Sequence, residues 1–193
     1  MNDTLIGLAE RVRQAAAAKA ILRIRGGSTK QAMAGVISDA ATLDMRAYAG
    51  IVDYAPSELV ITARAGTPLV ELERVLAERG QCLPFDPPRF ADADGRLAGT
   101  VGGMVAAGLA GPGRAAVGGV RDYVLGVLLL NGRGDLMHFG GQVMKNVAGY
   151  DVSRLLAGSW GALGAICEVS LKDRKSTRLN SSHSRRSRMP SSA

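Results

Sequence analysis

The sequence has 193 residues, of which 47% are hydrophobic and 4% aromatic, so a core can form but must be built mainly from aliphatic side chains. The formal net charge of +7 would suit a nucleic-acid partner, but six of the basic residues and one acid lie from Asp173 onward, which leaves +2 for the preceding 172 residues. We therefore expect no nucleic-acid partner.

Two cysteines, Cys82 and Cys167, lie far apart and form no C-x-x-C pair, which argues against a zinc site or a redox dithiol. We expect buried thiols and no metal. Sparse cysteine is typical of a reducing cytosol, and residues 1–20 lack the apolar centre of a signal peptide, so we expect a cytoplasmic location.

The first half of the chain predicts short strands between two helices. Residues 1–20 predict an amphipathic helix capped by Asp3 or Thr4, and residues 67–80 a second one with Thr67 as N-cap and Pro68 at its first position. Strands are predicted over residues 21–25, 41–46, 50–54, 58–66 and 81–88.

The second half predicts a short helix that starts after Thr100, then a β-hairpin over residues 121–141 with an Asn131-Gly132 turn. A short helix and a glycine-rich loop follow over residues 148–164, and the last strand covers residues 165–172. We expect an α+β domain over residues 1–172, with its two sheet regions divided near residues 90–99.

Three glycine clusters are the candidate ligand contacts. In "RGGSTK" (residues 25–30) a predicted strand ends in two glycines followed by hydroxyls, an arrangement in which backbone N–H groups can converge on phosphate oxygens. An ordinary glycine turn would explain the same residues. Neither G-x-x-x-x-G-K-[ST] nor G-x-G-x-x-G is present.

The second cluster, "GTVGGMVAAG" (residues 99–108), places glycines in a predicted helix, where each costs about 1 kcal/mol against alanine. Close approach of a ligand or of a sheet would offset that cost. The third, "GSWGALG" (residues 158–164), could lie against a flat ring or be a plain loop. Together the clusters favour one long ligand that has phosphates and flat rings.

Charged candidates are few. Arg121 and Asp122 at a strand entrance could contact ribose or phosphate, or form a surface pair. The residues before Asp173 include no evident Ser-His-Asp set, so the sequence points to no catalytic residue.

These clusters, in this order, resemble the FAD-binding domain of the vanillyl-alcohol oxidase and p-cresol methylhydroxylase (PCMH) superfamily. "GIVDYAPSELVITARAGTPLVELERVL" and "FGGQVMKNVAGYDVSRLLAGSWGALGAICEVSLK" are most similar to the FAD-binding subunits of bacterial glycolate oxidases. The resemblance implies a two-lobed PCMH-type FAD-binding domain, α+β, with two small sheets and flanking helices, and FAD between the lobes.

By the same resemblance, the loop at Arg25 lies along the pyrophosphate, the helix after Thr100 along the middle of FAD, and the last glycine loop near a ring. The expected FAD-binding residues are Arg25, Gly26, Gly27, Ser28, Thr29, Thr100, Gly102, Gly103, Ala106, Arg121, Asp122, Gly158, Ser159, Gly161, Gly164 and Ile166. Relatives with covalent FAD often carry a histidine just after the first glycine pair, where Ser28 and Thr29 stand here. We expect non-covalent FAD.

The resemblance further implies a part in oxidising a small 2-hydroxy acid such as glycolate, with hydride passing to the flavin. The expected partners are a second flavin subunit and an iron–sulfur subunit, in the cytoplasm or at the inner face of the plasma membrane through that complex. The substrate-binding cap lies after Lys172 in the family, so we expect the chain alone to be inactive. A lactate or aldonolactone oxidase, or a non-redox module for a phosphate-containing ligand, is the alternative.

The last 21 residues, 173–193, predict a disordered tail. Asp173–His183 and Ser187–Ala193 match two constant parts of a common sequencing adapter translated in one frame, with three residues between them. We therefore interpret this tail as translated adapter.

Overall fold

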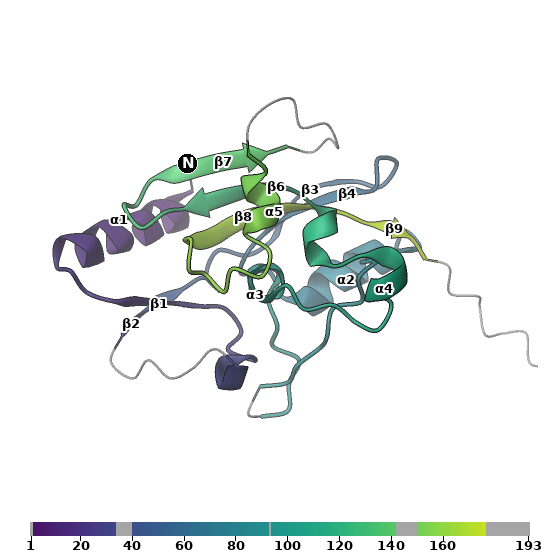
Figure 1. The fold of residues 1–193 in the computed structure, drawn as a ribbon, viewed down its shortest axis with the longest axis horizontal. Coiled ribbons are helices and arrows are strands. Elements are labelled where there is room, and N and C mark those ends of the chain that lie inside the picture. Colours follow the sequence, from purple (N-terminus) through teal and green to yellow (C-terminus); the bar gives the residue numbers. More distant parts are fainter. Residues whose placement is uncertain (1, 34–39, 93, 142–149, 177–193) are drawn as a thin grey trace, which may run out of the picture.

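The computed structural model describes residues 2–33, 40–92, 94–141 and 150–176 (Figure 1). Its helices are α1 (Asp3–Ala17), α2 (Leu69–Ala77), α3 (Val101–Ala107), α4 (Arg114–Val117) and α5 (Val152–Leu155), with 3-10 helices η1 (Gln31–Met33) and η2 (Val120–Tyr123). Its strands are β1 (Leu22–Arg25), β2 (Ala41–Asp44), β3 (Ile51–Ala55), β4 (Val60–Arg64), β5 (Gln81–Cys82), β6 (Val124–Leu130), β7 (Leu136–Gly140), β8 (Ala165–Lys172) and β9 (Arg174–Lys175).

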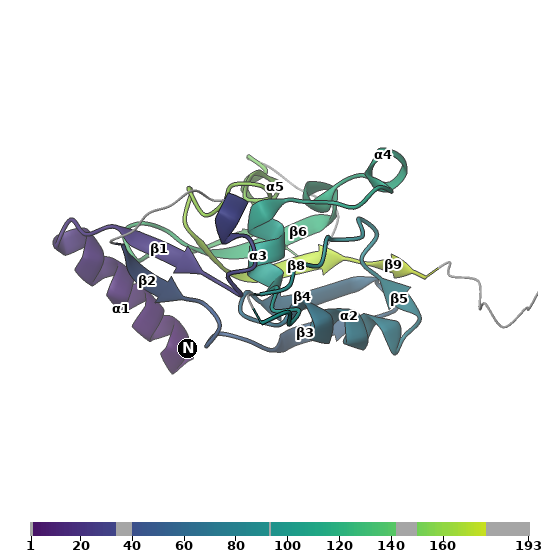
Figure 2. The same ribbon diagram turned by 90° about the horizontal axis from the view of Figure 1, so that it is seen from below.

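The central sheet is antiparallel and has the strand order β3-β4-β8-β6-β7. Two further pairs, parallel β1-β2 and antiparallel β5-β9, make three sheets among the described residues, where two were expected. The expected division near residues 90–99 is also not what the structure shows, because β4 from one side of that segment pairs with β8 from the other. The sheets divide earlier, between β2 and β3 (Figure 2).

The central sheet is covered on both faces. All seven residues of β6 are buried, and successive side chains point to opposite faces. Val127 and Leu129 join the core that contains residues of α2 and α3, whereas Leu128 and Leu130 join the core that contains residues of α1 and β2. Burial on both faces explains why β6 has no polar alternation.

Two helix starts differ from the prediction. Asn2, and not Asp3 or Thr4, caps α1, since its side chain accepts a hydrogen bond from the Thr4 N–H at 2.9 Å. The Thr67 hydroxyl donates to the Gly50 carbonyl at 3.1 Å and accepts from the Gly50 N–H at 2.9 Å, so it ties α2 to the segment before β3 and caps no helix.

The predicted two-residue hairpin turn is a five-residue loop over residues 131–135. The Asn131 side chain accepts from the backbone N–H groups of Arg133 and Asp135 at 2.8 and 3.0 Å. This side-chain bonding stabilises a wider turn than the Asn-Gly pair predicts. The predicted strand over residues 81–88 is also shorter, because only Gln81–Cys82 pair.

The chain stays ordered past Lys172. Asp173 is buried, and Arg174–Lys175 pair with Gln81–Cys82 as β9. Residues 177–193 of the expected tail lie outside the described residues. Cys167 is fully buried, which raises the pKa of its thiol to about 12, whereas Cys82 is partly exposed. In the described part of the chain, no helix is both long and apolar enough to cross a membrane.

Candidate cofactor-binding site

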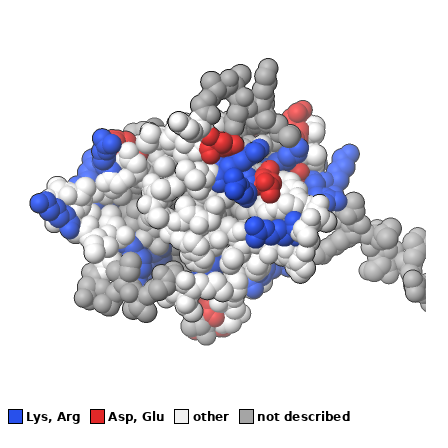
Figure 3. Space-filling model, in the orientation of Figure 1, with Lys and Arg blue, Asp and Glu red and all other residues white. Residues whose placement is uncertain are grey.

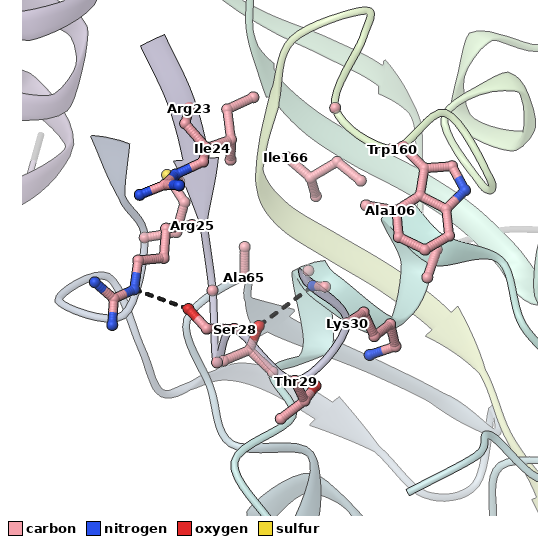
Figure 4. A pocket seen from close by; sticks show the side chains of 18 of the residues that line it. Arg23, Ile24, Arg25, Ser28, Thr29, Lys30, Ala65, Ala106, Trp160 and Ile166 are labelled. Atoms are coloured by element: carbon pink, nitrogen blue, oxygen red, sulfur yellow. Dashed lines mark hydrogen bonds between the residues drawn. The ribbon is translucent and has the colours of Figure 1, made fainter. Parts of the chain in front are cut away.

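A pocket of about 290 Å³ is lined by β1 and the loop after it, by α3 and by the loop before β8 (Figure 4). Its lining includes twelve of the sixteen residues predicted to bind the cofactor: Arg25, Gly26, Gly27, Ser28, Thr29, Thr100, Gly102, Gly103, Ala106, Gly161, Gly164 and Ile166. The fold therefore brings parts of all three glycine clusters to one place, and their contact with FAD stays a prediction.

The first wall is the loop after β1. Ser28 has a positive φ of 58°, which turns the chain sharply after the glycine pair, and its hydroxyl accepts from Arg25 Nε at 2.8 Å. This bond fixes the Arg25 side chain beside the loop (Figure 4). The loop can thus present backbone N–H groups and a guanidinium to the same anion.

The glycines of this loop are required by contact with the protein itself. A Cβ on Gly26 would lie 2.5 Å from Thr100 Oγ1, and one on Gly27 would overlap the backbone carbonyl of Ala98. The loop therefore packs directly on the segment that leads into α3. The sequence had left open a phosphate-binding loop or an ordinary glycine turn, and the structure adds that the atoms nearest to these two glycines belong to the neighbouring chain segment.

The second wall is α3. Thr100 caps it as predicted, accepting from the Gly103 N–H at 3.3 Å. A Cβ on Gly102 would lie 2.6 Å from the Ala65 Cβ, so this glycine lets the helix pack against the end of β4. Close packing against the sheet, one of the two explanations left open for this cluster, accounts for Gly102.

The third wall is the loop before β8, which is bonded to the end of α3. The backbone N–H groups of Gly158 and Trp160 donate to the carbonyls of Val105 and Ala106 at 3.1 and 2.9 Å. The Ala106 carbonyl lies at the helix end, where carbonyls lack an intrahelical partner, and the Val105 carbonyl also accepts from the Gly108 N–H at 3.0 Å. The two N–H groups are consequently not available to a ligand.

The electrostatics of the pocket favour an anion. Arg23, Arg25 and Lys30 line it, and its described lining includes neither Asp nor Glu. Arg23 Nε is buried and has no hydrogen-bond partner among the described residues. Burial also lowers the pKa of Lys30, whose Nζ lies 5.2 Å from the centre of the Phe90 ring. Phosphate oxygens would offset the desolvation of these cations.

Four predicted residues lie outside the pocket lining. The Asp122 carboxylate accepts from the Gly119 N–H at 2.8 Å and so holds the turn at η2, beside the exposed Arg121. Gly158 lies against Gly108 of the α3 end. The Ser159 hydroxyl is buried and has no partner among the described residues.

Sequence reasoning missed several lining residues, among them Arg23, Ile24, Met45 and Trp160. Arg23 could have been found, because it lies two residues before Arg25 and strand residues at that spacing share a face. Met45 follows β2, and only the β1-β2 pairing brings it to the pocket. No group of His, Cys, Asp or Glu able to hold a metal occurs within the described ranges.

The pocket thus combines a cationic, glycine-rich side, where Ile24 lies between Arg23 and Arg25, with an apolar side that includes Ala106, Ile166 and Trp160 (Figure 4). Such a site suits a long ligand with phosphates in one part and a flat ring in another. The fold and this site are typical of proteins that bind a nucleotide cofactor.

Comparison with known proteins assigns the family. Residues 7–140 match the family described as "FAD binding domain", and the chain belongs to this family. It is 52% identical over 165 residues to the glycolate oxidase subunit GlcE of Escherichia coli (strain K12), a match that covers 86% of this chain and 45% of that protein. It is 31% identical over 122 residues to the glycolate oxidase subunit GlcD of Bacillus subtilis (strain 168), covering 63% of this chain and 25% of that protein.

The chain spans less than half the length of these curated relatives. Among solved structures, alkyldihydroxyacetonephosphate synthase matches with a TM-score of 0.67 and 23% identity, covering 87% of this chain and 30% of that chain. These matches confirm the predicted PCMH-type fold and the FAD cofactor. The pocket residues fit FAD, since the buried, unpaired Arg23 Nε and the cations beside it suit its pyrophosphate.

Proposed function

We propose that this chain is the FAD-holding part of a flavin-dependent 2-hydroxy-acid oxidoreductase, with glycolate as the first substrate to test. The observation that carries the proposal is the meeting of the three glycine segments at one cationic pocket. The 52% identity to a glycolate oxidase subunit supports the substrate class.

Different residues of the pocket would contact different parts of the cofactor. Arg23, Arg25 and Lys30 would neutralise the pyrophosphate, and Ser28 would keep Arg25 in place. Ile24 and Ile166 offer apolar contacts that exclude water from a ring. FAD, when bound, supplies the hydride acceptor of the reaction.

Non-covalent binding is part of the proposal. Ser28 and Thr29 follow the glycine pair, and the described pocket lining contains neither histidine nor cysteine that could attach to the flavin. We expect FAD to appear in the supernatant after acid precipitation of the loaded protein. Yellow colour that stays with the washed precipitate would contradict non-covalent binding.

The proposed partners are a second flavin subunit and an iron–sulfur subunit. The names of the two relatives, glycolate oxidase subunits GlcE and GlcD, support a multi-subunit enzyme. Electrons taken from the substrate would leave the complex through these partners.

To test the proposed activity, residues 1–172 of this chain replace the matched region of the E. coli subunit GlcE within its assembled complex. We expect glycolate to reduce the flavin of this chimera, and Arg25→Ala in the same chimera to weaken FAD retention. A chimera that assembles and holds FAD but is reduced by no 2-hydroxy acid would refute the proposed activity. A chain that holds ADP yet no FAD would favour a non-redox module.

A further inference from the structure

Trp160 has an unusual backbone conformation beside the pocket. Its φ is 53°, in the left-handed region that bulky residues rarely adopt. Its N–H donates to the Ala106 carbonyl at 2.9 Å, and the nearby glycines Gly158 and Gly161 also have positive φ. The loop therefore holds a large side chain where glycine would be less strained.

The Trp160 side chain is also poorly buried. It is 45% exposed, although it lines the pocket. In Figure 4 the indole and Ala106 lie on the opposite side of the pocket from Arg23 and Arg25. On the face seen in Figure 1, uncharged side chains cover much of the centre, and charged side chains gather to the right of it (Figure 3). Core packing thus does not account for a strained tryptophan at this position, and such outliers tend to occur at ligand sites.

We propose that the Trp160 indole is the contact surface for one of the two flat rings of FAD. The inference rests on the FAD-binding role of the chain and adds a residue that contacts the cofactor. If the pyrophosphate lies at Arg23 and Arg25, a ring joined to it can extend across the apolar side toward the indole. Aromatic surfaces of this kind stack on flat rings and so stabilise binding.

The first test compares FAD affinity between variants by titration, followed through flavin fluorescence. Trp160→Ala should bind FAD about tenfold more weakly than the wild type, since it loses a stacking surface. Trp160→Phe should keep most of the affinity. Tyr150→Ala is the matched control, because Tyr150 is 98% exposed and is not among the lining residues.

A second variant separates ring contact from a structural role. Trp160→Gly relieves the left-handed strain, so the protein without FAD should unfold at the same or a higher temperature than the wild type. Its FAD affinity should nevertheless fall as in Trp160→Ala. Parallel losses of stability and affinity in this variant would indicate a structural role and overturn the proposal.

Separate titrations with FMN, ADP and inorganic pyrophosphate identify the ring. Trp160→Ala should weaken the binding of FMN or of ADP, whichever carries the contacting ring, and leave pyrophosphate within twofold. The ring contact alone would be overturned if Trp160→Ala lost equal affinity for all three ligands, or if this variant bound FAD within twofold of the wild type. No FAD binding by the wild-type protein would instead overturn the cofactor role and the contact with it.

Discussion

Asp173 offers the sharpest test of how burial governs stability in this fold. The residue is 1% exposed, and neither carboxylate oxygen has a hydrogen-bond partner among the described residues. Burial raises the pKa of this carboxyl from 3.8 to about 6. The unfolded chain therefore loses this proton at lower pH than the folded chain does.

These two pKa values determine whether the stability rises or falls with pH. Because the carboxyl pKa is raised on folding, Asp173 does not lower the free energy of unfolding below about pH 4. It lowers that free energy progressively as the pH rises from there through 6. The difference between these two pKa values corresponds to roughly 3 kcal/mol of lost stability at pH 8, and to about half of that at pH 5.

Urea unfolding at pH 5 and pH 8 measures this penalty. Asp173→Asn is nearly isosteric and cannot ionise, so it should gain up to about 3 kcal/mol over the wild type at pH 8 and clearly less at pH 5. Asp94→Asn, at an exposed carboxylate, is the control and should follow the wild type at both pH values. An Asp173→Asn gain that is the same at both pH values would refute the reasoning.

The buried carboxylate without a partner belongs to the first residue that matches the sequencing adapter. A buried, unpaired carboxylate disagrees with its surroundings in a way that residues selected for a fold rarely do. We expect the genomic gene, read past Lys172, to encode a residue other than Asp at position 173. The same Asp in genomic DNA would contradict that interpretation of the tail.

Other substitutions test the packing around the pocket. Gly27→Ala should abolish stable FAD binding and lower the unfolding temperature, because its Cβ overlaps the Ala98 carbonyl. The matched control is Gly7→Ala, which meets nothing within 4 Å in α1 and should stabilise the protein by about 1 kcal/mol; equal effects of the two would refute the packing argument. Tyr48→Phe removes the hydroxyl that donates to Glu168 and should cost about 1–2 kcal/mol in urea unfolding. An unchanged free energy of unfolding would show that this bond makes no net contribution.

The amino-acid sequence determined the elements with strong local signals. The Thr100 cap, the apolar runs of β6 and β8 and the end of α2 near Gly80 follow from side-chain and backbone preferences that act over a few residues. The three glycine clusters could also be found locally, since glycine marks close approach of any kind.

Only the tertiary structure decided what approaches those glycines and which cluster members share the pocket. Gly27 meets the Ala98 carbonyl and Gly102 meets Ala65, both contacts between segments far apart in the sequence. The local sequence made Arg121 as good a candidate ligand contact as Arg25. In the structure, β1 places Arg25 at the pocket, whereas Arg121 lies in η2, outside the pocket. Local preferences fix each segment, whereas pairing of β1 with β2 and of β4 with β8 fixes which segments meet, and that pairing depends on burial summed over the whole chain.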